Sequence, residues 1–390
     1  MNNMDKQQVH ISKKSVSGSR EPLFHIVKRD ALPWWHSLAI RICSVLAALV
    51  LCAIITVILT GDNPIAIYAT MFKGAFGNSS TFKRKIWVLI HDVAILLGIS
   101  LAVTPAFKMR FWNCGANGQV LIGGLAAAAC MIYLSDKLPT PIYLIVMFVL
   151  CALAGAIWAI IPAFFKAHWG TNETLFTLML NYVAAQLVLV CITFWETPKG
   201  SGTVGIINQS TKNGWLPIIG GTQFLGRNYI LNIAIVAIIL VAIFIYLKYS
   251  KHGYEISVVG ESENTAKYIG INVKKVIIRT MALSGIICGI MGMMIVAGGN
   301  NHTINENIVS NRGFTAIMVS WLAKFDPFVM IFTSFILVFF DKGGAQVATD
   351  FDLNSSFSMI LTGIILFFII GSDFLINYRV VFKHFKKEGK

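Results

Sequence analysis

Charged residues are scarce in this chain: they make up 13% of its 390 residues, whereas hydrophobic residues make up 56%. Soluble domains carry about 25% charged residues, which cover their water-facing surface. This composition excludes an ordinary soluble protein and predicts a chain that lies in a membrane. At roughly 20 apolar residues for each span, the chain can hold about ten membrane-spanning helices.

Catalytic and phosphate-binding motifs are also missing. The chain has no HExxH or GxSxG motif, and its only Gly-Lys pair is Gly389-Lys390 at the terminus, so no GxxxxGK[ST] phosphate loop is present. The GxGxxG match at 200–205 follows a predicted span and has no strand before it, which excludes a dinucleotide site. The seven Cys form no CxxC pair and predict neither zinc nor disulfides. We expect no catalytic residue, no metal site and no cofactor.

The apolar runs predict an all-α polytopic membrane protein of about ten transmembrane helices. The predicted spans are residues 38–60, 87–106, 118–134, 141–164, 174–195, 229–247, 276–298, 313–323, 327–341 and 357–378. Residues 1–36 are interpreted as a cytosolic N-terminal tail, 37–380 as the transmembrane domain with a loop at 249–275, and 381–390 as a cytosolic C-terminal tail.

The formal net charge of +14 is explained by topology, because Lys and Arg collect in short cytoplasmic loops and tails. We therefore expect membrane lipids around the chain and no nucleic-acid partner, and we place both termini in the cytoplasm. One external segment is an exception, because it carries four basic residues: Lys73, Lys83, Arg84 and Lys85. The external segments 61–85 and 196–228 are interpreted either as a docking face for a binding protein or as simple connectors.

A polar segment, residues 253–271, lies between two long apolar runs and is flanked by basic residues. Acidic residues at its start and Gly270 as a stop predict a short helix over 261–269; composition alone also fits a solvated loop. The residues that carry a resemblance are Gly260, Glu261, Ala266, Tyr268 and Gly270. Their order resembles the coupling helix of ATP-binding-cassette importer permeases of the branched-chain amino-acid, simple-sugar and nucleoside group. The resemblance implies contact with an ATP-binding subunit there.

The stretch 111–124 places three amide side chains beside glycines at the start of an apolar helix: Asn113, Asn117 and Gln119. Amides can donate and accept hydrogen bonds without bringing charge into the membrane, although Asn113 and Asn117 also suit helix caps. The stretch resembles the nucleoside-permease signature, with Asn117 where the family has Glu. We predict that these three residues line the substrate path.

A third stretch runs from Asn172 and Glu173 to Asn181. Asn172 suits a helix cap, and Glu173 suits the positive end of a helix. Asn181 lies within an apolar run, where a polar side chain usually faces other helices or a cavity. Because this stretch resembles the nucleoside-type permeases, all three residues are assigned to the substrate path. His91 and Asp92 lie within a predicted span and match no family motif.

The segments 313–323 and 327–341 are too short for ordinary spans and fit half-helices or a tilted hairpin. The first of them resembles the family segment that reads Gly-Phe-x-x-Ile. Interrupted segments at corresponding positions of two halves indicate inverted repeats with a site between them. Here 117–122 is matched with 312–317.

These resemblances imply the permease subunit of an ATP-binding-cassette importer in a bacterial plasma membrane, for nucleosides. The implied partners are an ATP-binding subunit, a second homologous permease and a substrate-binding lipoprotein. A simple sugar or a branched-chain amino acid is the alternative substrate. An ion-coupled secondary transporter is a further hypothesis, for which Asp92, near the start of its span, is the only candidate acid. A scaffold or receptor without transport is another.

Overall fold

The structure is a computed structural model and describes residues 24–29, 33–61, 63–218, 229–299, 302–354 and 356–382. Within these ranges, nine helices are long and apolar enough to cross a membrane. They are α1 (Trp34–Thr60), α3 (Phe82–Lys108), α4 (Ala116–Tyr133), α5 (Thr140–Trp169), α6 (Glu173–Trp195), α7 (Ile230–Tyr249), α10 (Val273–Ala297), α12 (Pro327–Asp350) and α13 (Ser356–Asn377). Shorter elements are α2 (Pro64–Phe76), α8 (Lys251–Glu261), α9 (Glu263–Tyr268), α11 (Arg312–Leu322), β1 (Phe24–Lys28) and β2 (Tyr378–Phe382).

The chain divides into two compact units, residues 1–55 with 363–390 and residues 56–362. In the smaller unit, β1 pairs antiparallel with β2, and Arg41 of α1 forms a 2.9 Å ion pair with Asp373 of α13. Strand β1 therefore lies within the segment that the sequence assigns to the N-terminal tail. The predicted tails beyond residues 24 and 382 fall outside the described residues.

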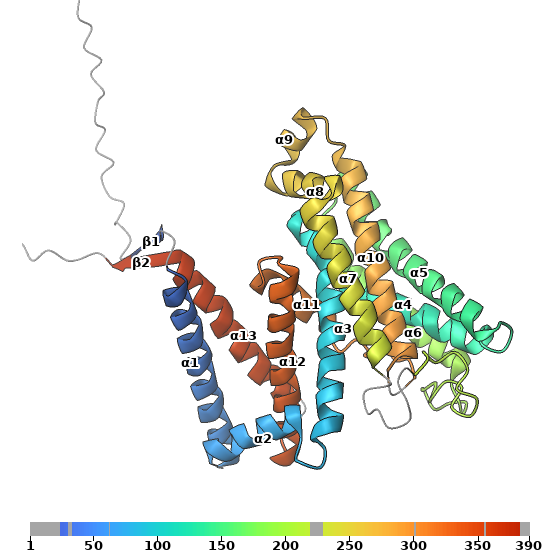
Figure 1. Cartoon of the computed structure of the whole chain (residues 1–390), viewed down its shortest axis with the longest axis horizontal. Helices are drawn as coiled ribbons and strands as arrows, with labels where there is room; N and C mark the ends of the chain where they lie inside the picture. Colours follow the sequence, from blue (N-terminus) through green and yellow to red (C-terminus); the bar gives the residue numbers. More distant parts are fainter. Residues whose placement is uncertain are drawn as a thin grey trace, which may run out of the picture. The chain divides into compact units, whose positions relative to one another are not determined.

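The core of the larger unit lies around α10, which packs against α3, α4 and α5 (Figure 1). Glycines on α10 allow this close approach: Gly289 lies against the backbone of Cys151 on α5, and Gly292 against the backbone of Val120 on α4. Small residues let helix backbones approach closely and gain van der Waals contact, which is the main attraction between helices in lipid. The α10 face that meets α4 and α5 therefore includes close backbone contacts at these glycines.

Helix α11 agrees with the half-helix expected over 313–323, whereas α12 corrects the short segment predicted over 327–341. Helix α11 has 11 residues, about 16 Å at 1.5 Å per residue, roughly half of a hydrocarbon core of about 30 Å. Helix α12 has 24 residues and is long enough to cross. It begins where the Asp326 carboxylate accepts hydrogen bonds from the N–H groups of Phe328 and Val329, at 2.9 and 3.2 Å. The pair is therefore one half-helix and one full span.

Two segments contain helices where the sequence predicted otherwise. The predicted external loop 61–85 contains α2, which has Asn63 as its N-cap and Pro64 at its first position, a strong local start signal. The short helix predicted over 261–269 is α9, which starts where the Ser262 side chain accepts a hydrogen bond from Thr265 N–H. The residues before it, for which no helix was predicted, form α8. Gly270, with φ +86°, follows the end of α9. Helices α8 and α9 lie at one end of the larger unit (Figure 1).

Candidate functional site

The two interrupted segments meet at their helix N-termini. Helix α4 begins at Ala116 after the turn 113–115, and α11 begins at Arg312 after the non-helical segment 302–311. The Asn117 Oδ1 atom accepts a hydrogen bond from the backbone N–H of Gly313 at 2.8 Å. The first turns of α4 and α11 therefore lie side by side, and these are the segments that the sequence analysis matched as a repeat.

A cavity of about 280 Å³ lies at this junction. Its wall comes from α4, α6, the segment before α11 and the first turn of α11; the lining residues are Asn117, Gly118, Leu121, Leu178, Asn181, Tyr182, Ala185, Glu306, Asn307, Val309, Ser310, Asn311 and Phe314. Ligand pockets of roughly 300–1,000 Å³ accommodate drug-sized molecules, so this cavity suits a smaller solute. Of the predicted path residues, Asn117 and Asn181 are brought together here.

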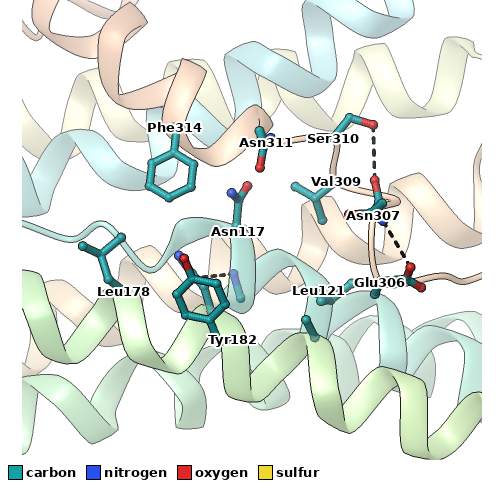
Figure 2. Close-up of a pocket in the computed structure, with 13 residues that line it drawn as sticks. Asn117, Leu121, Leu178, Tyr182, Glu306, Asn307, Val309, Ser310, Asn311 and Phe314 are labelled. Carbon is teal, nitrogen blue, oxygen red and sulfur yellow. Dashed lines mark hydrogen bonds between the residues drawn. The ribbon is translucent and has the colours of Figure 1, made fainter. Parts of the chain in front are cut away.

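The cavity has two chemically different ends (Figure 2). Phe314 and Leu178 lie at one end, and Glu306 and Asn307 lie at the other. Tyr182 lies between them and is 68% exposed. The aromatic rings therefore lie toward one end and the carboxylate toward the other, where Leu121 and Val309 also lie.

Asn181 supports the wall of this cavity from α6. Its Oδ1 atom accepts a hydrogen bond from Gly118 N–H at 2.8 Å, and its Nδ2 group donates to the Cys114 carbonyl at 2.9 Å. Backbone groups at a helix start have no intrahelical partner, and in lipid they must find one within the protein. Asn181 therefore fixes the break before α4 and contributes to the cavity lining.

Asn113 and Gln119 do not line the cavity. Both are buried, and their side-chain amides bond to each other, with Gln119 Nε2 3.0 Å from Asn113 Oδ1. Asn113 also donates to Ser284 Oγ of α10 at 3.1 Å. This pair holds the turn before α4 against α10.

Asn172 and Glu173 also lie away from the cavity. The Asn172 side chain accepts a hydrogen bond from Leu175 N–H at 3.1 Å and caps α6. The Glu173 carboxylate forms an ion pair with Lys166 at the end of α5, at 2.8 Å. Together they fix the turn between α5 and α6.

The five coupling residues fall into two groups. Gly260 packs against the Lys108 carbonyl at the end of α3, and Ala266 is fully buried. Glu261, Tyr268 and Gly270 are exposed, Tyr268 by 94%. The first group therefore contacts this chain, and the second is open to a partner.

Helix α8 is tied to α10 by an ion pair. The Arg279 guanidinium lies 2.8 Å from the Glu255 carboxylate, and this hydrogen bond holds the pKa of that carboxyl below its ordinary value. The lowered pKa means that the charged form of Glu255 is favoured by its partner. The end of the unit that carries α8 and α9 is thus linked to its central helix.

A buried ion cluster lies behind the N-terminus of α11. The Asp92 carboxylate of α3 lies 2.6 Å from Lys342 Nζ, 3.3 Å from Arg312 and 3.5 Å from His91 Nδ1. The other ring nitrogen of His91 lies 3.0 Å from the Asn232 amide of α7. Sequence reasoning singled out His91 and Asp92 and had no signal for their partners.

Comparison with known proteins identifies the family. Residues 86–370 match the family described as branched-chain amino acid transport system / permease component. The chain belongs to this family. It is therefore a multi-pass membrane protein and the permease subunit of an ATP-binding-cassette transporter, a transport component rather than an enzyme, and its partners include an ATP-binding subunit.

Three relatives of this permease extend over most of its length. A glucose permease of Haloferax volcanii is 28% identical over 90% of this chain and 92% of its own length. A nucleoside permease of Lactococcus lactis is 25% identical over 79% and 84%. A guanosine permease of Bacillus subtilis is 24% identical over 85% and 92%. No solved structure matches the chain.

Proposed function

We propose that this permease imports nucleosides. The observation that carries the proposal is the two-ended cavity, with aromatic and apolar side chains at one end and Glu306 and Asn307 at the other. A nucleoside has the same division, because its base is flat and its ribose carries hydroxyls. Aromatic rings stack on the flat face of any nucleobase. Carboxylate and amide oxygens accept hydrogen bonds from hydroxyls.

The lining argues against an amino acid as substrate. None of the thirteen described residues that line the cavity is Lys, Arg or His. An amino-acid carboxylate removed from water needs a cationic or strongly donating partner, since an unpaired buried charge is costly. The one charged side chain among these residues is the Glu306 carboxylate, which repels an amino-acid carboxylate and can accept hydrogen bonds from a neutral solute.

A simple sugar is the second candidate substrate. Glu306 and Asn307 also suit the hydroxyls of a sugar, and the glucose permease aligns with 90% of this chain. A free sugar carries hydroxyls around most of its ring, so it does not use the Phe314 and Leu178 end as fully as a nucleoside base does. The similarity to the nucleoside and guanosine permeases also favours a nucleoside over a sugar.

The working assembly that we propose has a second homologous permease, an ATP-binding subunit and a substrate-binding lipoprotein, in a bacterial plasma membrane. Both termini and α8–α9 then lie in the cytoplasm, where the exposed Tyr268 faces the ATP-binding subunit. Tyr182 lines the cavity and is 68% exposed, so the cavity has an opening at the surface of this chain. We assign that opening to the path between the two permeases.

Uptake by the reconstituted complex tests the substrate. Proteoliposomes holding both permeases, the ATP-binding subunit and the lipoprotein are given labelled uridine, glucose, ribose or leucine, with ATP or without it. ATP-dependent uptake of uridine above the other three supports the proposal. Uptake of glucose, ribose or leucine without uridine contradicts it, and uridine uptake that needs an ion gradient instead of ATP assigns the chain to secondary transport.

A further inference from the structure

Among the described residues that line the cavity, Glu306 is the only carboxylate. It lies in the segment 302–311 that leads into α11, and it is half-buried. The signature that residues 113–119 resemble has Glu at the position of Asn117, which lies on α4. The cavity therefore keeps one acid, at a place where the signature does not have it.

The hydrogen-bonding capacity of Glu306 is largely unused within the described part of the chain. There, one donor reaches its carboxylate, the Asn307 side-chain amide at 3.1 Å from Oε1, and no cationic side chain pairs with it. An ionised carboxylate has two oxygens with about four acceptor positions. Glu306 is half-buried in the cavity wall, and its unused acceptor positions can bind hydrogen-bond donors of a solute in the cavity.

A vicinal diol supplies donors of this kind. Two neighbouring hydroxyls can donate to both oxygens of one carboxylate, and hydrogen bonds to a charged acceptor are shorter and stronger than those between neutral groups. In a nucleoside whose base contacts Phe314 and Tyr182, the ribose lies toward Glu306 and Asn307, at the other end of the cavity (Figure 2). We propose that Glu306 binds the 2′,3′-diol of ribose, so that the permease selects ribonucleosides over 2′-deoxyribonucleosides. This inference rests on the proposed function.

The test compares labelled uridine with 2′-deoxyuridine in the reconstituted complex. The wild type is expected to import uridine about tenfold better, which corresponds to about 1.4 kcal/mol. Glu306→Gln keeps the shape of the side chain and removes its charge. We expect it to lower uridine uptake about tenfold and leave 2′-deoxyuridine uptake nearly unchanged, so that the ratio falls toward one.

The control is Glu196→Gln, a carboxylate outside the cavity that accepts hydrogen bonds from Gly200 and Gly202 N–H. This variant should keep the wild-type ratio of uridine uptake to 2′-deoxyuridine uptake. The lipoprotein is the same in every sample, so a change in the ratio belongs to the permease. Glu306→Asp, which keeps the charge and withdraws it by one methylene, should also lower the ratio.

The outcomes separate this inference from the proposed function. If the wild type does not import uridine, the proposed function itself is wrong. If uridine is imported and Glu306→Gln keeps the wild-type ratio, or loses both substrates equally, Glu306 does not recognise the diol. Equal uptake of the two nucleosides by the wild type overturns the inference as well.

Discussion

The side-chain oxygen of Asn117 accepts a hydrogen bond from the backbone N–H of Gly313 at 2.8 Å, across 196 residues of sequence. This bond joins the first turn of α4 to the first turn of α11, and both turns line the same cavity. The N-terminus of each helix carries a partial positive charge. An uncharged acceptor between the two therefore satisfies one free N–H group and holds the two cavity walls in register.

Asn117→Ala should lower uridine uptake about tenfold. It leaves Gly313 N–H without its partner, at a cost of about 1–3 kcal/mol, and it loosens the wall of α11. Asn117→Asp is the matched variant, because it keeps an acceptor oxygen at the positive end of α11, and it should retain more activity than the Ala variant. Uptake in proteoliposomes measures both. An equal loss of uridine uptake in the two variants would show that the acceptor oxygen at position 117 is not required for transport.

Asp92 should be required for stability. Asp92→Asn leaves the Lys342 and Arg312 cations without their carboxylate, and removing one partner of a buried pair costs about 3–5 kcal/mol. Asp373→Asn, which breaks the more exposed pair with Arg41 in the smaller unit, is the control and should cost much less. Thermal unfolding of the purified chain in detergent measures the difference. Similar melting temperatures for the two variants would contradict a supporting role for the cluster.

Asn181→Leu should lower both uptake and stability. Leu suits an apolar helix, but it removes the partners of Gly118 N–H and the Cys114 carbonyl, each at a cost of about 1–3 kcal/mol. Gln186→Leu on the same helix is the control, because Gln186 is exposed and lies outside the cavity lining. Uridine uptake about tenfold below wild type, with a lower melting temperature, is the expected result. Unchanged behaviour of Asn181→Leu would remove its role in supporting the cavity wall.

The spans were predictable because apolar length is a local property of the sequence. The prediction of 174–195 agrees closely with α6, and that of 229–247 lies close to α7. A span must be about 20 residues long to cross a hydrocarbon core, so composition sets its bounds. Helix α11 has only 11 residues and is fixed by contacts with α3 and α4, which the sequence alone does not show.

The candidate site was predictable only in part, for a similar reason. Asn117 and Asn181 stand out because amides in an apolar run are costly unless they have partners. Glu306 lies in a polar segment, where an acid is unremarkable, and its place in the cavity depends on how 302–311 folds back onto α4 and α6. Arg312 meets Asp92 across 220 residues, so that contact has no local signal either.

The exposed Tyr268 should be required for coupling ATP hydrolysis to uptake. Its side chain is 94% exposed at the end of α9, and Tyr is enriched among the residues that dominate protein interfaces, where truncation costs about 2 kcal/mol or more. Gly270 is a poorer probe, because its φ of +86° strains any side chain. Tyr268→Ala should lower ATP-driven uptake at least about tenfold and leave the melting temperature of the chain unchanged. Tyr249→Ala, which removes an exposed Tyr at the end of α7, is the control and should transport normally. Normal uptake by Tyr268→Ala, measured with all partners present, would place the contact with the ATP-binding subunit elsewhere.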